Sequence, residues 1–332
     1  ARVLRRHGGT YASHVRDEAN RVFEAVNEAI SVGEAAGVRV QVAHLKLSGT
    51  DNWGRTQDLL GLISNARERG VDVHCDQYPY TAGTNPLRNL FPLWVHAGGV
   101  EAMLARLTDP QVLGRIRTDI DRDGLNNFGR VESWDAILIA ITAGQPAMVG
   151  RTVGAIASER SCDPLQTARD ILLADKGHTR IVVTSMSEED VQDILRSPMV
   201  MVGSDGNSLA TYGVTSQGSP HPRFYGTFPR VLGRYVRELG ILPLPLAVYK
   251  MTGGSAAALR LRERGTLLEG CWADITVFDP REVGERSTYD APHRYAAGIS
   301  TVVVNGQVVI EGGEHTGALP GRVLRRRAGG VE

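Results

Sequence analysis

Hydrophobic and polar residues alternate in short runs along the first part of the chain, and stretches of helical spacing separate these runs. Val38–His44 (VRVQVAH) and 71–77 (VDVHCDQ) carry an apolar residue at every second position, which is typical of strands. GGTYASH at 8–14 predicts a further short strand. The stretches 17–37 and 55–70 have helical spacing and end at a glycine. This order of strands and helices predicts an α/β fold built from parallel βα units.

The alternation of predicted strands and helices stops at about residue 87 and starts again after about residue 178. We expect 87–178 to be an insertion with helical segments that forms part of a pocket wall. Beyond it, strands are predicted at 180–186 and 199–205, each followed by a helical pattern. From about residue 263 onward the sequence is β-rich with Gly and Asn-Gly turns. The pattern therefore predicts two parts, at 1–262 and 263–332.

Composition and charge limit the class of partner. The chain has 332 residues, 42% of them hydrophobic, and its 37 basic residues balance 37 acidic ones. This balance gives no electrostatic basis for binding nucleic acid or an anionic membrane. No apolar run reaches the ~18–20 residues that span a bilayer. Three cysteines without a CxxC pair fit a reducing compartment, so we expect a cytoplasmic protein.

Four polar side chains of related chemistry stand where predicted strands end. They are His14, His44, Lys46 and Asp205. Parallel βα units bring the carboxyl ends of their strands to one face. Imidazole nitrogens and a carboxylate on that face match the donors that zinc prefers. The sequence therefore predicts a zinc-type site formed by His14, His44 and Asp205.

The alternation of the second strand also predicts which way its side chains point. His44 and Lys46 are in phase with the valines of Val38–Val42, so we expect them to share one face. Arg39 and Gln41 would then face the helix layer, and His74 on the next strand is likewise expected to face a helix. A bulge before His44 would be needed to relieve the burial of Arg39 and Gln41.

Besides His14 and His44, we expect His221 to have a functional role, as a residue that binds substrate, and the remaining histidines to be structural. His221 follows the Asp205 loop in SPHPRFYG and stands beside Arg223. An arginine at this place can bind a carboxylate through two parallel hydrogen bonds. Cys75 lies in mid-strand without an activating base, so a buried and inert thiol is expected there.

Several segments together resemble one enzyme family. YASHVRDE, VQVAHLKLSG, DQYPYTAGTNPL, VGSDG, HPRFYGTFPRVLG, MTGGSAAALRL and GTLLEGCWADITVFDP occur in this order over nearly the whole chain. They resemble the N-acyl-D-amino-acid deacylase (D-aminoacylase) family of the amidohydrolase superfamily. The resemblance implies a distorted TIM barrel beside a small β-sandwich. It also implies zinc-dependent hydrolysis of N-acyl-D-amino acids to a carboxylate and a D-amino acid, with one zinc ion held tightly.

The resemblance assigns roles to particular residues. His14 and His44 are similar to the family's metal ligands on the fifth and sixth barrel strands. Asp205 resembles the aspartate of the eighth strand, which is both near the metal and catalytic. Lys46 and Arg223 resemble the residues that bind the substrate carboxylate. Either Tyr78 or Tyr80 corresponds to a tyrosine near the scissile carbonyl.

The chain also departs from the family pattern. It contains no HxH motif and no cysteine before His14, both of which supply metal ligands in the family. We therefore expect residues 1–262 to hold only strands 5–8 of the barrel, and the chain by itself to be inactive. Two alternatives stay open: another amidohydrolase of the dihydroorotase or hydantoinase type, and an inactive remnant without a metal site.

Overall fold

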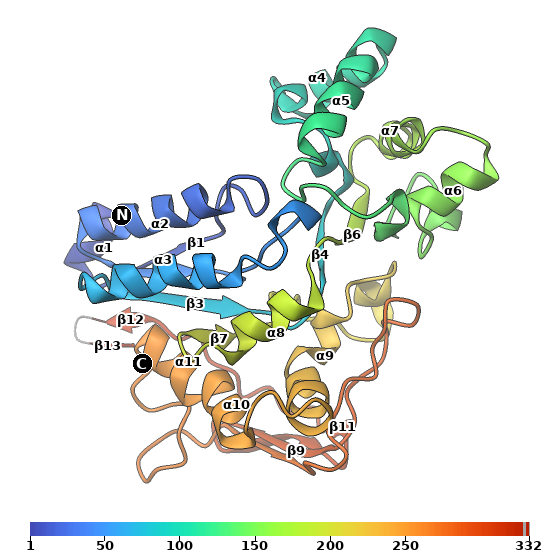
Figure 1. The fold of residues 1–332 in the computed structure, drawn as a ribbon. Helices are drawn as coiled ribbons and strands as arrows, with labels where there is room; N and C mark the ends of the chain where they lie inside the picture. Colours follow the sequence, from blue (N-terminus) through green and yellow to red (C-terminus); the bar gives the residue numbers. More distant parts are fainter. Residues whose placement is uncertain (328–329, 332) are drawn as a thin grey trace.

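A computed structural model describes residues 1–327 and 330–331. Its centre is an open, four-stranded parallel sheet in the order β1-β2-β3-β7 (Figure 1). The strands are β1 (Thr10–Ser13), β2 (Arg39–Val42), β3 (Val73–Gln77) and β7 (Val200–Val202). The parallel βα arrangement predicted from the sequence is confirmed. No closed barrel forms within the described residues.

Helices cover one face of this sheet. They include α2 (Val22–Ala36), α3 (Thr56–Glu68) and α8 (Glu188–Arg196), and a short α1 (Arg2–Arg6) opens the chain. Val40 and Val42 are fully buried in the cluster that contains Ile30 of α2 and Ile63 of α3. The contact is tight, because a Cβ atom at Gly33 of α2 would lie 1.9 Å from Cγ2 of Val40.

The predicted side-chain orientation of β2 was therefore wrong. Val40 and Val42 face the helices, whereas Arg39 and Gln41 face the opposite side. His74 pairs across the sheet with Gln41 and shares its face, so its predicted orientation was wrong as well. The strand ends at Val42, and His44 adopts a left-handed backbone with φ of 40°. This turn ends the two-residue period before His44, so no bulge is needed to separate its orientation from that of the valines.

Residues between β3 and α8 form a separate lobe that extends away from the parallel sheet (Figure 1). Its sheet has the order β4-β6-β5 and is antiparallel. The strands are β4 (Ala82–Pro86), β5 (Ile137–Ile141) and β6 (Arg180–Thr184). The helices are α4 (Gly99–Leu107), α5 (Pro110–Asp123), α6 (Val153–Glu159) and α7 (Pro164–Ala174), with 3₁₀ turns at Leu87–Leu90, Leu93–His96, Trp134–Ala136 and Pro146–Met148. We call this lobe, 82–184, the excursion.

The prediction that 180–186 resumes the βα rhythm was wrong. β6 pairs with β4 and β5 and makes no pair with the parallel sheet. Its Ile-Val-Val run is buried, and a short apolar run of this kind fits either type of sheet. Only the strand with which β6 pairs distinguishes a parallel from an antiparallel sheet. That strand, β4, lies about a hundred residues away in sequence, with Ala82 opposite Thr184.

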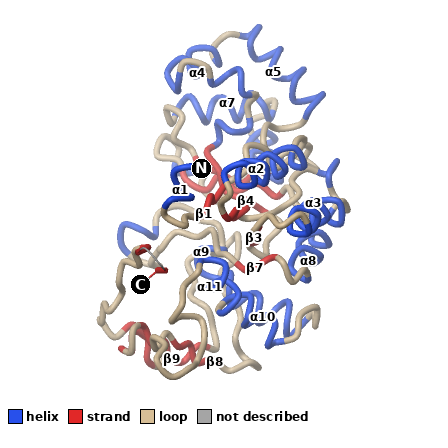
Figure 2. The backbone as a smooth tube through the Cα atoms, turned by 90° about the vertical axis from the view of Figure 1, so that its left-hand side faces the viewer, coloured by secondary structure: helices blue, strands red, loops and turns tan. Residues whose placement is uncertain are grey.

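The remainder of the chain packs below the parallel sheet. Helix α9 (Arg223–Arg230) continues directly into a π-helix at Val231–Glu238, and α10 (Leu244–Met251) and α11 (Gly253–Leu259) follow. A four-stranded antiparallel sheet then forms from β8 (Ile275–Phe278), β9 (Ile299–Val304), β10 (Gln307–Glu311) and β11 (Glu314–His315). Figure 2 shows this sheet and the excursion helices at opposite ends of the molecule.

Four further short elements complete the description: 3₁₀ turns at Thr50–Asn52 and Gly213–Ser216, and the strands β12 (Arg326–Arg327) and β13 (Gly330–Val331), which pair with each other. The β-rich end of the chain is thus a small β-sheet subdomain, as expected. The predicted part 263–332 includes residues 328–329 and 332, which lie outside the described residues. Within the described residues, no helix has both the length and the apolar character needed to cross a bilayer.

Candidate metal and substrate site

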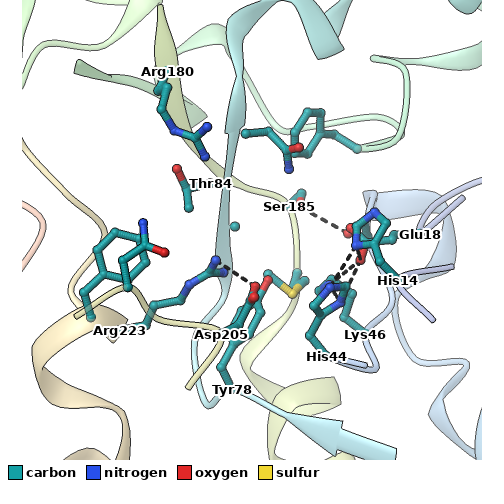
Figure 3. A pocket seen from close by; sticks show the side chains of 17 residues that line it. His14, Glu18, His44, Lys46, Tyr78, Thr84, Arg180, Ser185, Asp205 and Arg223 are labelled. Carbon is teal, nitrogen blue, oxygen red and sulfur yellow. Dashed lines mark hydrogen bonds and ion pairs between the residues drawn. The ribbon is translucent and has the colours of Figure 1, made fainter. Parts of the chain in front are cut away.

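A pocket of about 270 Å³ opens where the parallel strands end (Figure 3). It brings together His14, His44, Lys46, Asp205 and Arg223, all of which were candidates from the sequence. Its wall comprises His14, Glu18, His44, Lys46, Ser48, Tyr78, Gly83, Thr84, Asn85, Phe128, Arg180, Ser185, Met186, Asp205, Asn207, Arg223 and Phe224. The predicted convergence of strand ends on one face is therefore observed.

Two imidazole rings lie in contact at one side of the pocket. Nδ1 of His14 is 2.8 Å from Nε2 of His44. His14 follows β1 and is half-exposed, whereas His44 follows β2 and is buried. The backbone N–H of His44 donates to Oδ1 of Asp76 (2.9 Å), which holds the strained φ of this residue. Two lone pairs at this distance would repel each other, so a proton or a cation between the nitrogens is required.

A buried ion pair supports this corner. Oε1 of Glu18 lies 2.5 Å from Nζ of Lys46, 3.0 Å from Nδ1 of His44 and 3.6 Å from Nδ1 of His14. Burial alone would raise the pKa of Glu18, but Lys46 and the two histidines outweigh it and hold that pKa well below its usual range. Burial alone would lower the pKa of Lys46, but Glu18 outweighs it and raises that pKa. Both groups are therefore charged.

The donors of this corner fit a divalent ion of the zinc type. Nδ1 of His14, Nε2 of His44 and Oε1 of Glu18 form a group whose ligand atoms all lie within 4.8 Å of one another. Nitrogen and carboxylate oxygen are usual zinc donors. Asp205 is outside this group, so the structure assembles only two of the three predicted metal residues. Ligation by Asp205 stays a prediction.

Asp205 is instead paired with Arg223. Nη2 of Arg223 lies 2.7 Å from Oδ2 of Asp205. Asp205 has a left-handed φ of 45° at the end of β7, so both His44 and Asp205 occupy a backbone region that costs energy for residues other than glycine. Arg223 is buried, and its Nε has no hydrogen-bond partner among the described residues. A buried N–H without a partner is costly, so this group favours an acceptor close by.

Comparison with known proteins places the chain in a family. A family model for the amidohydrolase family matches residues 5–310. The chain belongs to the amidohydrolase family. It is 36% identical to a D-aminoacylase of Alcaligenes xylosoxydans xylosoxydans over 327 residues, which cover 98% of this chain and 57% of that relative. An N-acyl-D-glutamate deacylase of the same organism is 34% identical over 99% of this chain and 57% of its own length.

Solved structures agree with this result. A crystal structure of the N-acyl-D-glutamate deacylase of Bordetella bronchiseptica, complexed with zinc and a phosphonate inhibitor that mimics the tetrahedral intermediate, superposes with a TM-score of 0.74 at 33% identity. The match covers 93% of this chain and 54% of that one. The resemblance drawn from the motifs is thereby confirmed. The chain spans a little over half the length of the relatives it matches.

The two candidate tyrosines of this amidohydrolase occupy different places. Tyr78 lines the pocket, and its ring lies beneath Arg223 (4.5 Å from Cζ to the ring centroid) and Lys46 (5.2 Å from Nζ). Burial raises the pKa of Tyr78, so its hydroxyl keeps its proton. Tyr80 is outside the pocket wall and donates to Oε2 of Glu285 (2.8 Å). The geometry therefore favours Tyr78 as the residue that meets a substrate.

His221 also lies behind the pocket wall. It is fully buried, and its Nε2 lies 2.9 Å from the carbonyl oxygen of Ala82, to which it donates. Its Nδ1 accepts from the backbone N–H of Arg223 (3.0 Å). The predicted substrate contact of His221 is thus not seen, and the ring instead fixes the start of α9, which carries Arg223.

Sequence reasoning missed Glu18 and the residues that the excursion adds to the wall. Glu18 stands four residues after His14 in YASHVRDE, and this spacing was the available signal. Thr84 and Arg180 had no such signal, because their place depends on the pairing of β4 with β6. The prediction for Cys75 agrees with the structure, since this thiol is fully buried and burial raises its pKa.

Proposed function

We propose that this protein is a zinc-dependent deacylase that hydrolyses N-acyl-D-amino acids to a carboxylate and a D-amino acid. The observation that carries the proposal is the shared pocket of the His14–His44 pair and the Arg223 guanidinium. Such a substrate requires two binding groups: a metal ion held by histidines for its amide, and a cation for its α-carboxylate. Relatives named for this activity are 34–36% identical over nearly the whole chain.

His14 and His44 would hold the ion. A bound zinc ion would lower the pKa of a water molecule and polarise the amide carbonyl. With Nε2 of His44 as a ligand, its Nδ1 faces Oε1 of Glu18 (3.0 Å) and Nζ of Lys46 (2.7 Å). A carboxylate in this position fixes both the tautomer and the ring orientation of a histidine ligand.

Asp205 is proposed as the general base and acid. Its carboxylate takes a proton from the attacking water and delivers it to the leaving amine nitrogen. The ion pair with Arg223 orients the carboxylate toward the pocket. The left-handed backbone of Asp205 is further consistent with this role, since strained residues cluster at active sites.

The substrate carboxylate would bind at the cationic side of the pocket. The free Nε of Arg223 and the ammonium group of Lys46 both lie beside the Tyr78 ring. Charge-assisted hydrogen bonds from these groups would orient the scissile amide toward the metal corner. The hydroxyl of Tyr78, which keeps its proton, can donate to the carbonyl oxygen.

The test uses the full-length protein loaded with zinc. We expect release of a D-amino acid from N-acetyl-D-amino acids, little reaction with the L-enantiomers, and loss of activity when a chelator removes zinc. Ring opening of hydantoins without hydrolysis of the linear substrates would support the hydantoinase-type alternative. Absence of any turnover together with absence of zinc binding would support the inactive remnant.

A further inference from the structure

Asp76 lies near the carboxyl end of β3, the strand between β2 and β7 in the parallel sheet. His44 follows β2 and Asp205 follows β7, and both have a left-handed backbone. This conformation costs energy for residues other than glycine and persists only where the surrounding structure holds it. Asp76 therefore stands between the two strained residues of the site, and its side chain contacts both neighbouring strand ends.

The first contact is with the turn after β2. Oδ1 of Asp76 accepts from the backbone N–H of His44 (2.9 Å), and the carbonyl oxygen of Asp76 accepts from the N–H of Leu45 (2.7 Å). Oδ2 accepts from Nε2 of Gln41 (2.5 Å). Among the described residues, this carboxylate forms hydrogen bonds with neutral donors and no ion pair. It is thus held by hydrogen-bond geometry at the point where the chain leaves β2.

The second contact is with the end of β7. Gly203 follows β7 directly and precedes Asp205 by two residues. Its N–H donates to the carbonyl oxygen of Gln77 of β3 (3.0 Å). A Cβ atom at Gly203 would meet three atoms of Asp76, with Oδ1 at 2.9 Å, Cγ at 3.2 Å and Cβ at 3.4 Å. Glycine at 203 therefore leaves room for the carboxylate, so the position of Asp76 and the path toward Asp205 depend on each other.

We propose that Asp76 is a positioning residue for the site, which orients His44 for the metal ion and fixes the start of the loop that carries Asp205. The inference rests on the proposed deacylase function. The backbone bond to Leu45 survives any substitution of Asp76, so the role depends on the side-chain contacts with His44 and Gly203. Groups that orient a metal ligand typically contribute about 10- to 100-fold to metal affinity or activity.

The experiment measures metal binding and kinetics of the full-length protein. Cobalt(II) binds the same kinds of donor as zinc, and its visible absorption bands report the geometry of those donors. Asp76→Ala should shift these bands and weaken cobalt and zinc binding by about 10- to 100-fold, since the N–H of His44 loses its acceptor. With N-acetyl-D-amino acids, kcat should fall about tenfold or more and KM should change less than about threefold, because Arg223 and Lys46 are left in place.

Asp76→Asn is the conservative variant. Its side-chain oxygen still accepts from the N–H of His44, and Gln41 can turn its own amide to accept from the new amide group. We expect cobalt bands and kcat close to those of the parent protein. Asp72→Asn is the matched control, because Asp72 lies at the opposite end of β3 and pairs with Arg39. This control should leave the cobalt bands unchanged.

Gly203→Ala reaches the same carboxylate from the other side. The added Cβ displaces Oδ1 of Asp76, so this variant should reproduce the band shift and the fall in kcat of Asp76→Ala. In the double variant Asp76→Ala/Gly203→Ala the crowded oxygen is absent. The loss should therefore match that of Asp76→Ala alone and should not be the sum of the two.

Three results would overturn the inference and leave the deacylase function standing. They are unchanged cobalt bands in Asp76→Ala, a loss in Asp76→Asn as large as in Asp76→Ala, and additive losses in the double variant. A parent protein that binds cobalt but hydrolyses no N-acetyl-D-amino acid would overturn the deacylase function, and the cobalt bands would still decide the role of Asp76.

Discussion

The two walls of the pocket are built in different ways. In the wall at the ends of β1 and β2, the side chains of Glu18, His44 and Lys46 are buried and contact one another at distances of 2.5–3.0 Å. The wall from the excursion is more exposed, and its Arg180 has no partner among the described residues. A paired, buried network fits groups whose geometry must not vary, whereas an unpaired group at the rim fits recognition of a variable substrate. We infer that the sheet carries the chemistry and the excursion carries the selectivity.

The largest expected effect comes from removing the proposed base on the sheet side. Asp205→Asn should lower kcat by about 10²- to 10⁴-fold, because the amide cannot accept the proton of the attacking water. Zinc content should stay unchanged if His14 and His44 carry the metal. Steady-state kinetics and elemental analysis of the same sample check both statements. Near-normal turnover would reject the assigned role, and loss of zinc would make Asp205 a ligand as well.

The second prediction concerns the buried Glu18–Lys46 pair and whether it supports His14 and His44. Glu18→Gln should lower the free energy of unfolding of the metal-free protein by about 3–5 kcal/mol, since it leaves the Lys46 cation buried and unpaired. The double variant Glu18→Gln/Lys46→Met should recover much of this loss.

Urea denaturation measures both Glu18 variants. Glu159→Gln is the control, because the Arg151–Glu159 pair is exposed and should contribute less than about 1 kcal/mol. Glu18→Gln should also weaken zinc binding by about 10- to 100-fold through the loss of the carboxylate beside His44. Unchanged stability and unchanged zinc affinity would show that the two walls do not differ in the proposed way.

His221, which lies where the two walls of the pocket meet, should make the stability of the protein depend on pH. His221 joins Ala82 of β4 to the start of α9, and burial, with Arg223, lowers its pKa well below 6.5. The unfolded chain therefore binds more protons than the folded one as the pH falls below about 6.5. Its contribution to the free energy of unfolding is intact above that pH and falls by up to about 1.4 kcal/mol per pH unit below it.

Replacing His221 by Gln removes this titration while keeping a donor and an acceptor. The slope of the free energy of unfolding between pH 6.5 and 5, from urea curves, should therefore be shallower in His221→Gln than in the parent protein. Parallel slopes in the two proteins would mean that the ring is not buried as a neutral group.

The smallest effect separates the two tyrosines. Tyr80→Phe should cost about 1 kcal/mol of stability, because it removes one hydrogen bond to Glu285, which keeps its pair with Arg230. Tyr78→Phe should leave stability nearly unchanged but lower kcat/KM about tenfold or more, since its hydroxyl faces the pocket. Thermal denaturation and kinetics of both variants check this. The reverse pattern would make Tyr80 the substrate contact.

Much of the site was predictable because its signals are local. His14, His44 and Asp205 stand at strand ends, and parallel strands present their carboxyl ends on one face irrespective of what surrounds them. The order of strand and helix was readable for the same reason, from the periodicity of neighbouring residues. The two histidines and their neighbour Lys46 could therefore be assigned to one pocket from local sequence alone.

Other features could not be read locally. The valines of β2 face the helices because they pack against α2 and α3. The strand ends at Val42, and the left-handed His44 breaks the alternation, so its orientation does not follow that of the valines. β6 joined an antiparallel sheet because its partners, β4 and β5, lie far away in sequence. The two tyrosines of YPY were separated by what packs around them, with Glu285 brought in from about two hundred residues further along the chain.

The sequence by itself determined which residues end the parallel strands and which chemical groups they bring to the pocket. The tertiary structure decided which of these groups meet. It placed Glu18 between Lys46 and the histidines, turned Tyr80 and His221 away from the pocket, and added Arg180 to the far wall. The physical reason is that backbone period and strand polarity are local properties, whereas a pocket is defined by contacts between segments that only packing brings together.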